Sequence, residues 1–263
     1  ILADIAKDFF PENLFQIAML SGRASSEVIA NGDIHGVSFT GSVETGKLVY
    51  AAAAQNLIPV QLELGGKNAV IINDTDDLPG TMSQIYGAAF QTGGQRCTSI
   101  SRVLVHKNLA AKAAELLAER ADAAVLGDGM EATTQMGPLC NLPHWKGVRD
   151  VTAKAIKEGA KPLAGAKAPD GAGPEGGYYY RPTILGDVQH QSTASQVEIF
   201  GPVLSVLEYD TFDQAMEMLN GTEFGLTSAL FSDSNALVQR FLQESQHGMM
   251  HVNHGTIPDN NMP

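Results

Sequence analysis

Short apolar runs alternate with longer helical patterns along this chain, and that alternation constrains its fold more than any other feature. Residues 37–40 have the pattern of a strand, residues 41–55 contain the start and body of a helix, and residues 58–64 are again strand-like. This rhythm is typical of parallel sheets, because each parallel connection must cross over the sheet and a helix usually makes the crossing. We therefore predict an α/β fold.

The same two patterns continue over the rest of the sequence. Helical periodicity predicts helices at residues 1–10, 26–30, 83–90, 109–125, 145–158, 211–219 and 235–246. Apolar or β-branched runs predict strands at residues 14–20, 69–72, 102–106, 178–180, 183–185, 203–209, 228–232 and 249–253. Residues 165–177 are rich in Gly, Ala and Pro and show no periodicity, so we predict a surface loop there.

The charge and composition of the chain exclude several classes of partner. The net charge is −12 at pH 7 and the isoelectric point is about 4.9, which argues against nucleic acid or an anionic membrane surface as the main partner. No window approaches the roughly 18 consecutive apolar residues of a membrane-spanning helix. Only His251 and His254 stand close together among the histidines, with no cysteine beside them, so we expect no metal site.

The two cysteines differ in their surroundings. Cys97 and Cys140 are too few for a disulfide framework and suit a reducing cytoplasm, which is the location we expect. Cys97 follows a Gly-Gly-Gln turn within the stretch QTGGQRCTSISR, where a cysteine can be presented into a cleft and Arg96 favours the nucleophilic thiolate. The alternative is a buried cysteine that serves as a small hydrophobic residue, but the polar, glycine-rich surroundings favour the nucleophile.

Two other sites beside turns are candidates for a function, one as a phosphate-binding site and one as a general base. Gly41 and Ser42 lie where a strand passes into a helix, so free amides and the helix dipole favour an anion such as phosphate there. A simple N-cap is the alternative, because the chain has no GxGxxG fingerprint. Glu63 is a carboxylate in an apolar strand before a double glycine, which suggests a buried general base. An exposed strand position or an ion pair with Lys67 are the alternatives.

Five motifs, taken in order, resemble those of the aldehyde dehydrogenase superfamily at that family's spacing. They are FTGSxxxG at residues 39–46, ELGGK at 63–67, GQxC at 94–97, EIFGP at 198–202 and GLTS at 225–228. Residues 253–263 also resemble the loop that leads to the family's Pro-Phe-Gly-Gly segment. The resemblance implies an aldehyde dehydrogenase-like α/β fold: residues 1–64 a partial Rossmann-type dinucleotide-binding domain, 65–248 the catalytic domain, and 249–263 a substrate-tunnel loop returning toward the cofactor domain.

The resemblance also implies a reaction. Cys97 would attack the aldehyde carbon to give a thiohemiacetal, with its own N–H as one donor to the oxyanion. Hydride transfer to NAD or NADP would leave a thioester, and Glu63 would activate the water that hydrolyses it. A carboxylate at position 63 favours a free acid as the product over an acyl-CoA.

The cofactor would bind through residues of the matched motifs. Glu198 is similar to the residue that binds the nicotinamide-side ribose, and Phe200 to the one that packs beside the nicotinamide, although a core position is the alternative for Phe200. The other implied cofactor-binding positions are Gly41, Ser42, Gly46 and Leu64. Gln95 and Lys67 lie within motifs and are interpreted as structural, while Arg102 is expected in an internal ion pair.

The departures from the family pattern limit what the sequence predicts. The family's chains are longer, so we expect this sequence to be a fragment that is inactive alone and whose full-length form is a homodimer or homotetramer. The polar residues Arg96, Thr98, Ser99 and His254, expected near the substrate, favour a small semialdehyde. The choice between NAD and NADP stays open. Two other functions remain as alternatives: a non-catalytic family member with a structural role, and a cysteine hydrolase, which would need a partner such as His106.

Overall fold

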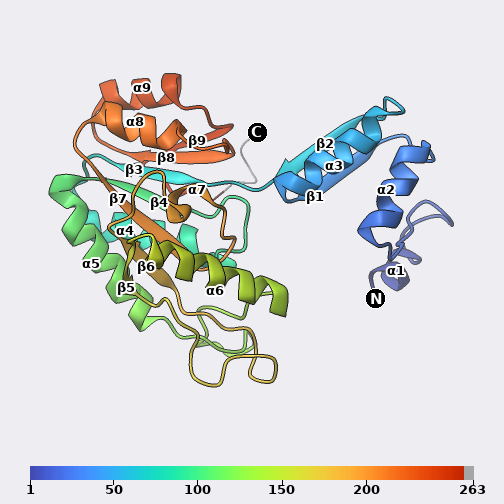
Figure 1. The fold of residues 1–263 in the computed structure, drawn as a ribbon, viewed down its shortest axis with the longest axis horizontal. Coiled ribbons are helices and arrows are strands. Elements are labelled where there is room, and N and C mark those ends of the chain that lie inside the picture. Colours follow the sequence, from blue (N-terminus) through green and yellow to red (C-terminus); the bar gives the residue numbers. More distant parts are fainter. Residues whose placement is uncertain (258–263) are drawn as a thin grey trace. The chain divides into compact units, whose positions relative to one another are not determined.

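The structure, a computed structural model, describes residues 1–257 (Figure 1). The chain forms two compact units, Ile1–Leu64 and Gly65–Pro263. Both units are built from helices and parallel strands, so the predicted α/β class is confirmed.

The Ile1–Leu64 unit is a small α/β layer. Its elements are α1 (Leu2–Ala6), α2 (Gly22–Asn31), β1 (Val37–Gly41), α3 (Val43–Ala54) and β2 (Val60–Leu64). Strands β1 and β2 pair in parallel, and α3 lies along them with α2 beside it (Figure 1). The buried core of this unit is limited to a few aliphatic side chains around Ile29, Ala52 and Ala53.

The strand predicted at residues 14–20 is wrong. This segment forms no strand, and its large side chains, among them Leu14, Phe15 and Leu20, are exposed. Within the described part of this unit, β1 and β2 pair only with each other, so no third strand is available to satisfy the backbone groups of the segment. The predicted first helix is also shorter than expected and ends at Ala6.

The Gly65–Pro263 unit is organised around a seven-stranded sheet. Its strand order is β5-β6-β7-β4-β3-β8-β9, and every pair is parallel except β5 with β6. The strands are β3 (Ala69–Ile72), β4 (Arg102–His106), β5 (Lys161–Ala164), β6 (Thr183–Gly186), β7 (Val203–Tyr209), β8 (Thr227–Phe231) and β9 (Met249–Val252).

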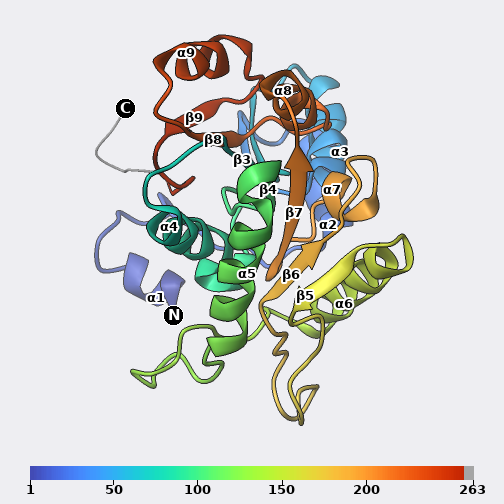
Figure 2. The same ribbon diagram turned by 90° about the vertical axis from the view of Figure 1, so that its left-hand side faces the viewer.

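Helices cover both faces of this sheet, as Figure 2 shows for α4 and α5 on one side and α6 on the other. Alternate residues of β3 serve the two layers: Ala69 and Ile71 belong to one buried cluster, and Val70 and Ile72 to the other. The helices are α4 (Leu78–Phe90), the 3₁₀ turn η1 (Gln91–Gly94), α5 (Lys107–Ala123), α6 (Leu142–Lys157), α7 (Thr193–Gln196), α8 (Phe212–Asn220) and α9 (Asn235–Glu244).

The structure differs from the sequence prediction at three places in this unit. Residues 178–180 form no strand, because the carbonyls of Tyr178 and Tyr179 accept from Leu139 N–H and from the Trp145 indole instead. The short elements β5 and α7 were not predicted. The strand predicted at residues 249–253 is present as β9, which pairs with β8 at the edge of the sheet. Residues 258–263 of the predicted substrate-tunnel loop lie outside the described residues.

None of the helices within residues 1–257 combines the length and the apolar character needed to cross a membrane.

Candidate active site

The candidate nucleophile lies on the loop between α4 and β4. Cys97 is exposed, as the glycine-rich junction predicted. It is part of a turn that is closed by a hydrogen bond from Ser99 N–H to the Arg96 carbonyl (3.1 Å). The N–H of Cys97 is not used to close this turn.

The backbone before the cysteine follows a path that requires glycine. Gly94 has φ +70°, and a Cβ placed there would lie 2.3 Å from the carbonyl oxygen of Gly201. Both facts exclude a side chain at this position. Thr92 also has a positive φ of 58°, so the turn stores strain in a non-glycine residue as well.

A buried asparagine holds the cysteine loop in place through hydrogen bonds to its backbone. Asn68 is 1% exposed, and its Nδ2 donates to the carbonyls of Cys97 (2.6 Å) and Ser99 (2.9 Å). Its Oδ1 accepts from Thr227 N–H (3.3 Å), so the amide group links the loop to β8. Because all these groups are buried or partly buried, the network holds the Cys97 backbone in one position. Asn68 was not predicted as a site residue, although it stands directly after the ELGGK motif.

Two more side chains support the loop. Gln95 donates from Nε2 to the Thr92 carbonyl (3.1 Å) and accepts at Oε1 from Cys140 N–H (3.0 Å). These contacts give Gln95 the structural role predicted for it. Thr256 donates its hydroxyl to the Thr98 carbonyl (2.7 Å).

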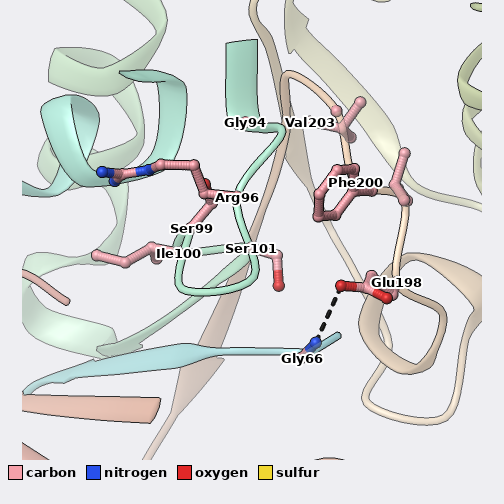
Figure 3. Close-up of a pocket in the computed structure, with 11 residues that line it drawn as sticks. Gly66, Gly94, Arg96, Ser99, Ile100, Ser101, Glu198, Phe200 and Val203 are labelled. Carbon is pink, nitrogen blue, oxygen red and sulfur yellow. Dashed lines mark hydrogen bonds between the residues drawn. The ribbon is translucent and has the colours of Figure 1, made fainter. Parts of the chain in front are cut away.

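Glu198 lies against the double glycine of residues 65–66. The N–H of Gly66 donates to Glu198 Oε1 at 2.9 Å (Figure 3). A Cβ on Gly65 would lie 2.0 Å from Glu198 Oε2, so the carboxylate occupies space that any side chain at position 65 would fill. Burial raises the pKa of Glu198, while the hydrogen bond from Gly66 and the nearby Lys67 charge lower it in part.

Phe200 shares a pocket with Glu198. Both line a hollow that is also bordered by Gly66, Ser101 and Val203, and Figure 3 shows the Phe200 ring above the Glu198 carboxylate. Phe200 is 39% exposed, which is unusual for a phenylalanine with a core role. Its φ of 53° is in the left-handed region, a strained conformation for a residue with a side chain.

Two basic side chains, those of Lys67 and Arg102, are buried in this unit. Lys67 is 1% exposed, and its Nζ has no hydrogen-bond partner within the described residues. Burial, followed by the charge of Arg102, lowers the pKa of Lys67 to about 7, and nearby Glu198 partly opposes this.

The ion pair predicted for Arg102 is wrong. Its guanidinium donates to the Lys67 carbonyl and to the carbonyls of Met218 (2.7 Å) and Leu219 (3.1 Å). The last two belong to the final turn of α8, where carbonyls lack helical partners and the helix dipole favours a cation. Burial lowers the pKa of Arg102 to about 10.

Some polar residues expected beside the cysteine point elsewhere. Arg96 donates from Nη2 to the Ala88 carbonyl in α4 (3.4 Å), and Figure 3 shows its side chain directed away from Glu198. Thr98 and Ser99 are buried. These three positions therefore do not form an open polar lining beside Cys97.

The strand-to-helix junction of the Ile1–Leu64 unit has the expected capping geometry. Ser42 Oγ accepts from Thr45 N–H (3.2 Å) at the start of α3. Gly46 lies one turn later, and a Cβ there would lie 2.7 Å from the Leu64 side chain, so glycine allows α3 to pack closely on β2. Gly41 and Leu64 are paired in the β1–β2 register.

The burial predicted for Glu63 is wrong. Strand β2 alternates half-buried and exposed positions, and Glu63 is on the exposed face together with Gln61. Gln61 donates from Nε2 to Glu63 Oε1 at 3.3 Å. The carboxylate is therefore accessible in this chain.

The described residues contain no group of three or more His, Cys, Asp or Glu side chains arranged to hold an ion. The rings of His251 and His254 are stacked with centroids 6.2 Å apart.

Comparison with known sequences identifies relatives along the whole chain. A family model described as the aldehyde dehydrogenase family matches residues 1–263. A betaine aldehyde dehydrogenase of Brucella anthropi is 36% identical over 243 residues, which cover 92% of this chain and 50% of the relative. One from Cereibacter sphaeroides is 35% identical with the same coverage. The chain thus spans about half the length of the curated relatives it matches.

Solved structures give the same result for the fold. A lactaldehyde dehydrogenase from Escherichia coli matches with a TM-score of 0.91 and 32% identity, covering 98% of this chain and 54% of that chain. A betaine aldehyde dehydrogenase from Staphylococcus aureus, solved in complex with NAD+, matches with a TM-score of 0.92 and 30% identity, covering 98% and 51%. The fold predicted from the five motifs is confirmed.

Proposed function

Because this chain belongs to the aldehyde dehydrogenase family, we propose that the protein containing it oxidises an aldehyde to a carboxylic acid, with NAD or NADP as the hydride acceptor. One observation carries the proposal. Gly66 and Asn68, two residues apart in the segment before β3, hold the Glu198 carboxylate and the Cys97 carbonyl respectively. One short, rigid segment thus fixes both the proposed nucleophile loop and the proposed ribose-binding residue.

The first proposed step is attack of the Cys97 thiolate on the aldehyde carbon. The new S–C bond gives a thiohemiacetal whose oxygen carries the negative charge. The N–H of Cys97, which the Arg96–Ser99 turn does not use, would donate to that oxygen. An exposed thiol on a backbone held by Asn68 supports this role, since a fixed nucleophile needs little reorganisation before it reacts.

Bound NAD or NADP would supply the acceptor for the hydride that this carbon loses. Cys97 then carries a thioester. A water molecule that has lost its proton to Glu63 attacks the thioester carbon, the C–S bond breaks, and the acid is released with Cys97 restored as a thiolate. We propose Glu63 for this role because its carboxylate is exposed and so can exchange protons with water. This route gives a free acid and not an acyl-CoA.

The residues proposed for the nicotinamide side fit the chemistry of a ribose and an aromatic ring. Gly66 N–H occupies Glu198 Oε1, which leaves Oε2 to accept a ribose hydroxyl. The partly exposed Phe200 ring lines the same pocket and offers an apolar surface to the nicotinamide.

The residues proposed for the phosphates lie at the start of α3. Ser42 caps Thr45 N–H, while the earlier amides of the helix have no intrahelical acceptor and suit an anion. Gly41 lets a phosphate approach the backbone, and Gly46 with Leu64 seats the helix on β2. These roles complete the proposed cofactor set of Gly41, Ser42, Gly46, Leu64, Glu198 and Phe200.

The substrate and setting are proposed more broadly. The relatives are named for betaine aldehyde and lactaldehyde, so we propose a small aldehyde as substrate and keep a semialdehyde among the candidates. Two exposed free thiols suit a reducing compartment, and we propose the cytoplasm. For the full-length protein we propose a homodimer or homotetramer.

The test measures the formation of reduced cofactor by the full-length protein with a panel of small aldehydes and semialdehydes. We expect turnover that Cys97→Ala abolishes. Cys140→Ala is the matched control, because Cys140 is the other exposed cysteine and its backbone N–H, which donates to Gln95, is kept. Its Sγ accepts from Asn141 Nδ2 (3.3 Å), but Asn141 caps α6 through Oδ1, so activity should persist. The present chain alone is expected to be inactive. A full-length protein that is silent with every aldehyde and both cofactors would support a non-catalytic role.

A further inference from the structure

The backbone of Phe200 needs outside support. Its left-handed φ of 53° is unfavourable for a residue with a Cβ, and such a conformation persists only where the surroundings enforce it. The next residue, Gly201, adds to the constraint, because a Cβ at position 201 would lie 2.7 Å from the Val148 side chain. The Phe200 segment is therefore pressed against α6.

His144 supplies that support from the first turn of α6. Its Nε2 is 2.8 Å from the Phe200 carbonyl oxygen. A carbonyl only accepts, so Nε2 must carry the hydrogen. His144 and Val148 are one helical turn apart and thus on the same face of α6, from which they contact residues 200 and 201 respectively.

The position of His144 is itself fixed. The side chain of Asn141, the N-cap of α6, accepts from the His144 N–H at 2.9 Å. The His144 and Phe200 rings meet edge to face, with centroids 6.0 Å apart and an interplanar angle of 66°. The imidazole thus touches both the carbonyl and the ring of the same residue, which is a closer constraint than helix packing alone provides.

We propose that His144 is a positioning residue for the nicotinamide: its hydrogen bond holds Phe200 in the left-handed conformation and so sets the ring surface that the cofactor meets. This inference rests on the proposed function, because it assumes that Phe200 contacts the nicotinamide. His144 touches neither substrate nor cofactor in this account. The hydrogen bond needs only the Nε2 proton, which both the protonated ring and one neutral tautomer carry.

The test compares two substitutions in the full-length protein. His144→Leu removes the donor, whereas His144→Gln keeps an N–H donor at a similar reach. With His144→Leu we expect kcat to fall by at least about tenfold, because small misplacement of a reacting ring slows its reaction strongly. The primary isotope effect on kcat with a C1-deuterated aldehyde should rise, since hydride transfer becomes slower than the other steps. His144→Gln should have a kcat and an isotope effect close to those of the wild-type protein.

Controls separate positioning from general damage. Lys146→Met changes an exposed side chain on the same helix and should behave as wild type. The rate at which iodoacetamide alkylates Cys97 should change far less than kcat in His144→Leu, because Asn68, Gln95 and Thr256 still hold the cysteine loop. Equal impairment of the Leu and Gln variants, or a wild-type isotope effect in His144→Leu, would overturn the proposal.

A crystal structure of His144→Leu gives a readout that does not depend on activity. We expect Phe200 to leave the left-handed region; an unchanged φ would overturn the proposal even if the protein never reduces NAD. Absence of turnover in the wild-type protein would count against the proposed function, and the Phe200 conformation would still decide whether His144 positions that residue.

Discussion

The two compact units differ in how firmly they are built. The Gly65–Pro263 unit buries two large apolar clusters, one on each face of a seven-stranded sheet. The Ile1–Leu64 unit has two strands and a small core, and large apolar side chains such as Phe9, Leu14 and Met19 are exposed in it. Burial of apolar surface is the main source of stability, so the proposed nucleophile lies on the stable scaffold and the proposed phosphate site on the weaker one.

The geometry at Cys97 is determined by contacts within the Gly65–Pro263 unit. Asn68, Gln95, Gly94 and Thr256 all act on the Cys97 loop from within the Gly65–Pro263 unit. Substitutions in this network should therefore have large effects, and equivalent substitutions in the Ile1–Leu64 unit should have small ones.

The largest effect is expected for Gly94→Ala. The new Cβ would meet the Gly201 carbonyl at 2.3 Å, and a φ of +70° is unfavourable for alanine, so the loop must move. We expect a loss of about 2–4 kcal/mol in the free energy of unfolding and at least about a hundredfold loss of activity. Unfolding in urea followed by tryptophan fluorescence measures this, because Trp145, the single tryptophan, lies in the same unit.

Gly147→Ala is the matched control for that substitution. Gly147 lies within α6, and nothing is within 4 Å of the position its Cβ would take. Alanine there should stabilise the protein by about 0.5–1 kcal/mol. Equal effects at the two glycines would contradict the packing described for Gly94.

Asn68→Ala should have the next largest effect. It leaves the buried Ser99 carbonyl and Thr227 N–H without their side-chain partner, which should cost about 2–3 kcal/mol. Activity should fall by more than the loss of folded protein alone would cause, because the Cys97 carbonyl also loses its hydrogen bond. Alkylation kinetics of Cys97 would report the altered loop. The exposed Asn108 provides a control, since Asn108→Ala should change stability by less than about 0.5 kcal/mol.

Lys67→Met should change the dependence of stability on pH. The pKa of Lys67 is about 7 in the folded protein and 10.5 for an ordinary lysine, so between these pH values the unfolded chain binds a proton that the folded chain lacks. The free energy of unfolding should therefore rise with pH, by about 2 kcal/mol between pH 7 and 9.

Below pH 7 lysine is protonated in both states, and this dependence should disappear. Lys67→Met should flatten the rise when urea unfolding is followed by Trp145 fluorescence. Lys146→Met removes an exposed lysine and should retain the rise. A wild-type protein whose stability is flat from pH 7 to 9 would show that Lys67 keeps its proton.

The smallest effect is expected for Gly46→Ala in the Ile1–Leu64 unit. The new Cβ would approach Leu64 Cδ2 at 2.7 Å, but that atom ends a flexible side chain that can move. The gain from replacing glycine in a helix offsets part of the cost, so we expect a net loss below about 1 kcal/mol. Hydrogen exchange of the β1 amides would measure it, with Gly36→Ala as the control at a roomier position. A loss as large as that of Gly94→Ala would remove the contrast between the two units.

Sequence patterns predicted the central strands well and the isolated segments poorly. Strands β3, β7 and β8 are apolar runs buried on both faces, so composition alone marks them. Residues 14–20 have the same composition but no partner strand, which a local pattern cannot reveal. Strand β5 is short and mostly exposed, and thus gives almost no signal.

At the candidate site, the sequence predicted the exposure of Cys97 but not the surroundings of several other residues. The exposure of Cys97 followed from its glycines. The contacts of Asn68, Arg102 and His144 all join residues at least 29 positions apart, so their partners depend on the tertiary fold. For Glu63 the local pattern was misinterpreted. Its apolar neighbours suggested burial, but exposed and half-buried positions alternate along β2 and Glu63 is exposed.

The most direct test of the central claim is to trap the covalent intermediate in the full-length protein. The protein is mixed with aldehyde and NAD or NADP, quenched in acid within a single turnover, digested and analysed by mass spectrometry. We predict an acyl group on the peptide containing Cys97, formed only when aldehyde and cofactor are both present, and none on the peptide containing Cys140. Turnover with no acyl group at Cys97, or with the acyl group at Cys140, would contradict the account.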